Sequence, residues 1–182
     1  MCLFSVIVPV FNTKVEYLEK CINSVCSQSF SNYELVIVND GSSEVSTNSF
    51  LENLNCLNKK NIKVLNQENK GVSTARNLGI QNSIGEYLLF LDADDFLNFD
   101  SFEKLSSVLE IVKYDILFFK YKTYYSKEKN FQQSEDNYTV CNLDSKEDIL
   151  KEIIDSKVIN ENVNYGTPWE KLIKRELLIK NS

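Results

Sequence analysis

The fold is decided by the stretch FSVIVPV at residues 4–10. This run is continuously apolar and rich in β-branched residues, which is typical of strands buried on both faces of a parallel sheet. Two further apolar runs predict strands at Leu35–Val38 and Tyr87–Leu91, and a strand is also predicted between them at Ile62–Leu65. Each of them ends in a polar turn, so the first half of the chain reads as a series of buried strands.

The segments between these runs have the spacing of amphipathic helices. Thr13 and Glu16 form a capping box that predicts a helix to about Ser27. Further helices are predicted over about 45–57, 73–82 and 99–112. The alternation of strands and helices predicts an α/β fold with a mainly parallel central sheet flanked by helices.

The second part of the chain is less regular. Residues 114–119 predict another strand, residues 120–142 an irregular or hairpin segment, and residues 145–156 a helix. A solvated helical face is predicted near the end of the chain, with the residues Glu170, Lys171 and Arg175.

Composition excludes several classes of function. The net charge of −6 gives no basic face for a nucleic acid, although a metal ion could still bring in a small phosphorylated ligand. The chain has no histidine, which removes Ser-His-Asp and Cys-His catalysis and histidine metal sites. Its five cysteines have no CxxC spacing, so we expect reduced thiols in the cytoplasm. No apolar run is long enough to span a membrane.

The acidic segment Asp92-Ala93-Asp94-Asp95 directly follows the fourth predicted strand, Tyr87–Leu91. Ligands of open α/β sheets bind at the carboxyl ends of the strands, and clustered carboxylates repel one another unless they share a cation. With no histidine and no nearby thiol, the expected cation is Mg²⁺ or Mn²⁺. The alternative is that one aspartate caps the next helix while the others are solvated.

Four segments, in this order, resemble family 2 glycosyltransferases of the GT-A fold: SVIVPVFN, LxxCIxSVxxQSFxxxELVIVNDGS, NKGVSTARNLGI and GEYLLFLDADD. The later GTPWEKLIKRELL resembles a segment found downstream in bacterial members. The resemblance implies a nucleotide-sugar-binding α/β core at residues 1–119. It also implies that residues 120–182 begin the acceptor-side region of a truncated enzyme.

By resemblance, Asp40 accepts a hydrogen bond from uracil, and Phe11 lies against the base. Asp92 and Asp94 match the DXD motif, so Asp94 should bind the metal and Asp92 the ribose or a metal-bound water. Arg76 should lie near the diphosphate or the donor sugar. The full set expected to bind the nucleotide and donor is Pro9, Phe11, Asp40, Gly71, Arg76, Asp92 and Ala93.

Each of these residues also has a structural alternative. Asp40 could form a turn or cap, Phe11 could belong to the core, and Arg76 could pair with an acid. Gly71 could let the backbone approach the ligand or merely close its turn, and Asp95 could ligate, cap or orient its neighbour.

The implied activity is inverting, metal-dependent transfer of a sugar from a UDP-sugar to a saccharide or lipid-linked acceptor, in bacterial surface polysaccharide synthesis. The sequence leaves contact with the inner face of the cell membrane open. The catalytic base is predicted to lie beyond Ser182, because Glu161 and Glu170 read as surface residues. Trp169 is a candidate for packing against the acceptor, with burial in the core as its alternative.

Three other functions compete with this interpretation. A dinucleotide-dependent oxidoreductase would need a glycine-rich turn where this chain has VFNTKVE. A phosphorylated receiver-like domain would need an acid at Asn12. A domain that binds nucleotide sugar without turnover stays open, and an activity assay with the intact donor separates it from an enzyme.

Overall fold

The computed structural model describes residues 2–56, 60–111, 113–119, 139–141 and 171–179, with the backbone alone for 139–141. The helices are α1 (Val15–Cys26), α2 (Val45–Cys56), α3 (Val72–Gln81), α4 (Ser101–Ile111) and α6 (Arg175–Ile179). The strands are β1 (Phe4–Val10), β2 (Tyr33–Asp40), β3 (Ile62–Gln67), β4 (Tyr87–Phe90), β5 (Ile116–Phe118), β6 (Thr139–Cys141) and β7 (Lys171–Lys174). The helix predicted at 145–156 lies outside the described residues.

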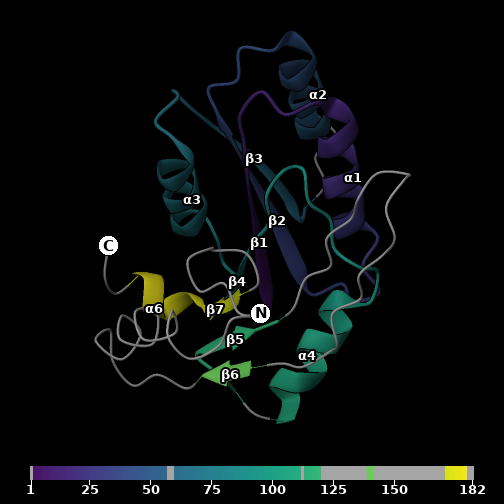
Figure 1. Cartoon of the computed structure of the whole chain (residues 1–182), viewed down its shortest axis with the longest axis vertical. Coiled ribbons are helices and arrows are strands. Elements are labelled where there is room, and N and C mark those ends of the chain that lie inside the picture. Colours follow the sequence, from purple (N-terminus) through teal and green to yellow (C-terminus); the bar gives the residue numbers. More distant parts are fainter. Residues whose placement is uncertain (1, 57–59, 112, 120–138, 142–170, 180–182) are drawn as a thin grey trace, which may run out of the picture.

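The strands form one sheet in the order β3-β2-β1-β4-β7-β5-β6 (Figure 1). Strands β3, β2, β1 and β4 are parallel to their neighbours, whereas β7 runs antiparallel to both β4 and β5, and β6 antiparallel to β5. The predicted α/β fold with a mainly parallel sheet and flanking helices is therefore confirmed.

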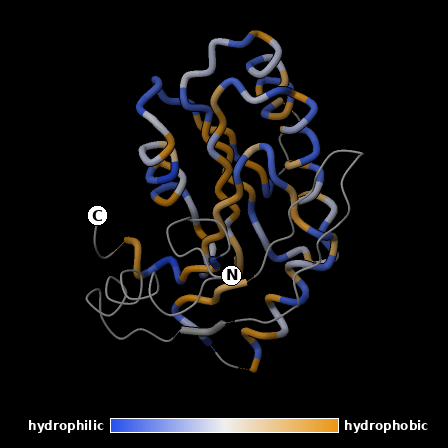
Figure 2. Tube along the Cα trace, in the orientation of Figure 1, coloured by the Kyte–Doolittle hydropathy of each residue, from blue (hydrophilic) through white to orange (hydrophobic). Residues whose placement is uncertain are grey.

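Both faces of the sheet are covered by helices, which explains the continuous apolar runs. One face packs against α1, α2 and α4, and the other against α3 and α6. Along β1, Val6 and Val8 point to the first face and Ile7 to the second, as strand alternation requires. The tube coloured by hydropathy shows the apolar residues concentrated in the central strands (Figure 2).

The direction of strand addition reverses at β1. The chain leaves β1 to form β2 on one side, and it reaches β4 on the other side only after α3 has crossed the sheet. The carboxyl ends of β1 and β4 therefore lie beside each other with connections leading away in opposite directions. In open α/β sheets this switch point is where ligands bind.

The predicted capping box at the start of α1 is wrong. Lys14 is the N-cap residue, and no side chain caps the helix. The Thr13 carbonyl instead accepts a hydrogen bond of 2.9 Å from Thr47 Oγ1 in α2. A tertiary contact from α2 thus fixes Thr13 ahead of α1, which begins at Val15.

The predicted helical face with Lys171 and Arg175 is also wrong, while Glu170 lies outside the described residues. Lys171 is only 7% exposed and begins strand β7, and Arg175 begins the short helix α6. In β7, Leu172 pairs with Leu89 on one side and Leu117 on the other. Pairing with the edges of β4 and β5 therefore makes residues 171–174 a strand despite their helical spacing, since strand formation depends on the surrounding sheet.

Within the described residues, no helix is both long and apolar enough to cross a membrane.

Candidate functional site

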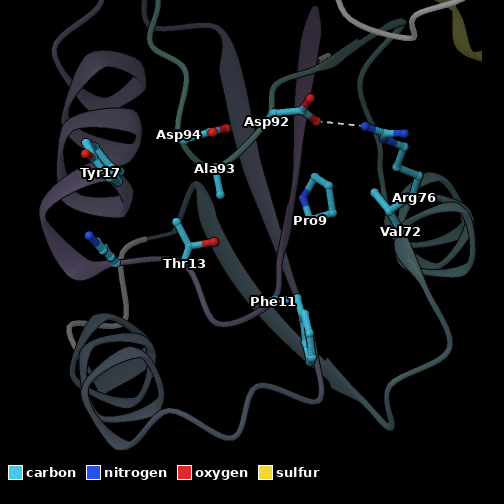
Figure 3. Close-up of a pocket in the computed structure, with 10 residues that line it drawn as sticks. Pro9, Phe11, Thr13, Tyr17, Val72, Arg76, Asp92, Ala93 and Asp94 are labelled. Carbon is cyan, nitrogen blue, oxygen red and sulfur yellow. Dashed lines mark hydrogen bonds and ion pairs between the residues drawn. The ribbon is translucent and has the colours of Figure 1, made fainter. Parts of the chain in front are cut away.

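A pocket of about 530 Å³ lies at the switch point between β1 and β4. Figure 3 shows Asp92 and Asp94 between Tyr17 on the α1 side and Arg76 and Val72 on the α3 side. The lining residues are Pro9, Phe11, Thr13, Lys14, Tyr17, Val72, Arg76, Asp92, Ala93 and Asp94. The fold thus brings six of the residues named from the sequence into one cavity.

Arg76 and Asp92 form an ion pair across the pocket. Arg76 Nη2 donates a hydrogen bond of 2.7 Å to Asp92 Oδ1, and the arginine side chain is 18% exposed. Arg76 Nε is buried and has no hydrogen-bond partner among the described residues. The guanidinium therefore holds the first carboxylate of the acidic segment through a single contact.

Asp94 presents its exposed carboxylate to the same pocket, and within the described residues no hydrogen bond or ion pair engages it. A turn orders the segment, because the Asp95 amide donates to the Asp92 carbonyl at 3.0 Å. Burial, and then the charges of Asp94 and Asp92, raise the pKa of Asp95. The segment thus carries concentrated negative charge, and among the described residues Arg76 is the cation that pairs with it directly.

A buried thiol lies behind this segment. Burial, followed by the three nearby carboxylates, raises the pKa of Cys21 to about 12. Its Sγ lies 3.6 Å from the Asp92 carbonyl oxygen, to which it donates. Since the thiolate is the reactive form of cysteine, Cys21 is an inert part of the packing.

The acidic segment fits a divalent cation in part. Within the described chain, no group of three or more acidic, cysteine or histidine side chains is gathered to hold a metal. Asp92 and Asp94 nevertheless line one pocket with carboxylate oxygens only. Such donors suit Mg²⁺ or Mn²⁺, which keep several waters and take further oxygens from substrate phosphates. The residues present therefore fit a metal that is completed by solvent and ligand.

Asp40 and Gly71 do not line the pocket but hold a neighbouring loop. Asp40 is 3% exposed, and its Oδ1 accepts hydrogen bonds from Gln67 Nε2 at 2.6 Å and from the Lys70 amide at 2.8 Å. Asp40 Oδ2 accepts one from the Gly71 amide at 2.9 Å. Burial would raise the pKa of Asp40, but these hydrogen bonds outweigh it and lower the pKa. This carboxylate fixes the approach to α3, the helix that carries Arg76.

Asn12 ties the end of β1 to the start of α2. Its backbone has a φ of 50°, a left-handed conformation that asparagine tolerates better than most residues. Its Oδ1 accepts hydrogen bonds from the amides of Ser43 at 2.7 Å and Glu44 at 3.1 Å. These contacts secure the loop that follows Phe11, whose side chain is 49% exposed at the pocket.

Four pocket residues were not predicted from the sequence as site residues, namely Thr13, Lys14, Tyr17 and Val72. One signal was available for Tyr17, which lies beside the buried stripe of α1 that begins at Leu18 and remains 44% exposed. An aromatic residue outside the apolar face of a helix can indicate a binding surface. Three residues discussed from the sequence, Glu161, Trp169 and Glu170, lie outside the described residues.

Comparisons with known proteins agree on one family. The model of glycosyl transferase family 2 matches residues 5–181. The glycosyltransferase GlyG of Streptococcus pneumoniae is 30% identical over 182 residues, which cover 96% of this chain and 58% of GlyG. The glycosyltransferase GlyA of the same organism is 36% identical over 127 residues, covering 70% of this chain and 18% of GlyA. The chain thus spans only part of these relatives.

Solved structures show the same architecture. The crystal structure of S. aureus TarS 1-349 in complex with UDP is 26% identical, with a TM-score of 0.69, and covers 98% of this chain and 48% of that one. The same protein has been solved with UDP-GlcNAc, with 26% identity, a TM-score of 0.69 and coverage of 98% and 47%. The GT-A fold implied by the sequence resemblance is confirmed.

Proposed function

This chain belongs to glycosyl transferase family 2, and from that premise we propose that it binds a UDP-sugar in the pocket between β1 and β4. The sugar is transferred to a saccharide or lipid-linked acceptor in bacterial surface polysaccharide synthesis, at the cytoplasmic side of the membrane. One observation carries the proposal: the fold brings Phe11, Arg76, Asp92 and Asp94 to one cavity at the switch point of the sheet.

Recognition of uridine is assigned to Phe11 and Asp40. The exposed ring of Phe11 offers an apolar face for the base. A carboxylate has about four acceptor positions, and three on Asp40 are taken by Gln67, Lys70 and Gly71. The position left on Oδ2 is the one that would accept the uracil N3–H. The complexes of TarS with UDP and UDP-GlcNAc support this choice of nucleotide.

The acidic segment is assigned to the diphosphate side of the donor. Asp94 is the carboxylate available to a divalent metal, while Arg76 holds Asp92 in the orientation needed for the ribose or a metal-bound water. A bound Mn²⁺ or Mg²⁺ would supply Lewis-acid stabilisation of the departing diphosphate. Ala93 is 6% exposed and keeps the two aspartates on a buried support at the floor of the pocket.

Transfer is proposed to invert the anomeric centre. A base takes the proton of the acceptor hydroxyl, whose oxygen attacks the anomeric carbon from the side opposite the leaving UDP. Residues 1–119 form the donor-binding core and residues 120–182 begin the acceptor-side region, with β7 returning from the latter to pair with β4.

The proposal is tested by titration calorimetry with UDP, in Mn²⁺ and in chelator. We expect metal-dependent binding that Asp94→Asn largely abolishes, because a neutral carboxamide binds a hard dication more weakly than a carboxylate does. The matched control is Asp100→Asn, the same change at an exposed residue paired with Lys104. Equal affinity for UDP with and without metal would contradict the assignment of Asp94, and equal competition by GDP would contradict that of uridine. Hydrolysis or transfer of the intact donor then distinguishes an enzyme from a binding domain.

A further inference from the structure

The charged side chains that line the pocket are unequally engaged. Arg76 and Asp92 are joined at 2.7 Å, so their charges largely cancel. The other two are Asp94, proposed to bind the metal, and Lys14, which the proposed function leaves without a role. Among the residues that the structure describes, no ion pair or hydrogen bond engages the Lys14 ammonium group. Lys14 is therefore the cation of this pocket that is available to a ligand.

The position of Lys14 is unfavourable for the helix that it begins. Lys14 is the N-cap residue of α1, where serine, threonine, aspartate or asparagine would satisfy an amide of the first turn. A lysine cannot accept such a hydrogen bond, and its charge is repelled by the positive end of the helix dipole. Glu16 in the first turn is favourable at this end of the helix, but no side chain caps it. Residues that break a local rule of stability tend to occur at functional sites.

The side of the pocket formed by α1 carries two of its lining residues, Lys14 and Tyr17. Lys14 and Tyr17 are three residues apart, which places them on one face at the start of α1. Figure 3 shows Tyr17 across the pocket from Arg76, with Asp94 on the side nearer to Tyr17. A diphosphate near Asp94 would bring its negative charge to this α1 side of the pocket.

Resting on the proposed function, we propose that Lys14 binds the diphosphate of the donor and is a specificity residue for phosphorylated over unphosphorylated uridine ligands. Arg76 is already engaged with Asp92, whereas Lys14 has no such contact within the described residues. Lysine binds phosphate as a flexible point charge, which suits an exposed residue at the rim of a pocket. The two cations of the pocket lining, Lys14 and Arg76, equal in charge its two aspartates. The lining is therefore neutral, so that the charges of a divalent metal and of the diphosphate can balance each other.

The experiment measures the affinity of uridine, UMP and UDP for the full chain and its Lys14 variants by calorimetry, in Mn²⁺ and again in chelator. We expect Lys14→Gln to weaken UDP roughly tenfold, the lower range for loss of a hydrogen bond to a charged group, and to leave uridine unchanged. Lys14→Arg should restore most of the affinity for UDP. The affinity of the wild type for UDP should also fall more steeply with added salt than that of Lys14→Gln.

Lys20→Gln is the matched control, because it removes the same charge from an exposed position on α1 that does not line the pocket. Thermal unfolding of all variants checks that α1 is intact. If the wild type binds neither uridine nor UDP, the proposed function itself fails. If the wild type binds UDP and Lys14→Gln binds it as tightly, only the assignment of Lys14 is overturned. A loss of uridine affinity equal to that of UDP would also overturn it.

Discussion

Changing Asp40 to asparagine keeps the shape of the side chain but replaces one acceptor oxygen with a donor group. Asp40 Oδ1 accepts hydrogen bonds from Gln67 Nε2 and the Lys70 amide, and Oδ2 accepts one from the Gly71 amide. The Gln67 side chain can turn its own amide to suit the variant. The two backbone amides cannot, and they lie against different oxygens. Whichever way the new carboxamide is oriented, one backbone N–H will therefore face an NH₂ group.

The magnitude follows from this orphaned amide. Leaving a buried donor unsatisfied costs about 1–3 kcal/mol. For a chain of this size, each kcal/mol lowers the midpoint of thermal unfolding by about 2–4 °C, so we expect a loss of roughly 2–12 °C. Calorimetry or circular dichroism measures it. The affinity for UDP should fall as well, because the same loop carries the start of α3.

The pH dependence gives a second check. The hydrogen bonds lower the pKa of Asp40 from its usual 3.8, so the carboxylate stabilises the fold fully above pH 3.8 and loses this contribution as the pH falls through the lower folded pKa. The difference between wild type and Asp40→Asn should therefore be constant between about pH 5 and 8. Asp100→Asn is the control, since its pair with Lys104 is exposed and screened by solvent. If both variants unfold with the wild type, the Asp40 network does not hold the loop.

Two further sites give sharp expectations. Gly41→Ala should destabilise the fold more than Gly71→Ala. Both glycines have a positive φ, but of the two only Gly41 would bring the new Cβ against backbone, at 2.6 Å from the Asn69 amide nitrogen. Equal midpoints of thermal unfolding for the two variants would contradict this. Glu34→Gln should cost about 0.5–1.5 kcal/mol, since it removes the ion pair with Lys63 at 2.9 Å. Burial raises the pKa of Glu34, but its hydrogen bonds and Lys63 outweigh burial and lower the pKa below 4.5. The loss of unfolding free energy in Glu34→Gln, measured by urea titration, should therefore be full above pH 4.5 and vanish at more acidic pH.

The parts of the fold that the sequence predicted correctly are those with a local cause. Strands β1, β2 and β4 contain continuous apolar runs because helices cover both faces of the sheet, and this burial is visible in composition alone. The acidic segment was likewise identified from its place after a buried strand. The roles given to Asp40, Arg76 and Asp94 stay predictions, because no ligand contact tests them.

The parts that were missed depend on contacts between distant segments. Strand β7 has a short pattern that suits a helix, and only the edges of β4 and β5 make it a strand. Lys14 belongs to the pocket because the position of α1 places it in the same lining as Asp94. The partners of Asp40 include two backbone amides, which carry no signature in the side chains.

The insertion of β7 between β4 and β5 has a consequence for the order in which the protein can mature. While a ribosome is still making the later residues, β1 to β4 can assemble, but the outer edge of β4 lacks its neighbour. Unpaired edges of this kind attract other chains, so the nascent protein is exposed to aggregation until residues 171–174 emerge. Pairing of β7 with β4 closes the long loop between Phe90 and Lys171, and the closure of long loops is slow. We therefore expect the insertion of β7 to be the late step of folding, and the support beneath the acidic segment to become rigid only then.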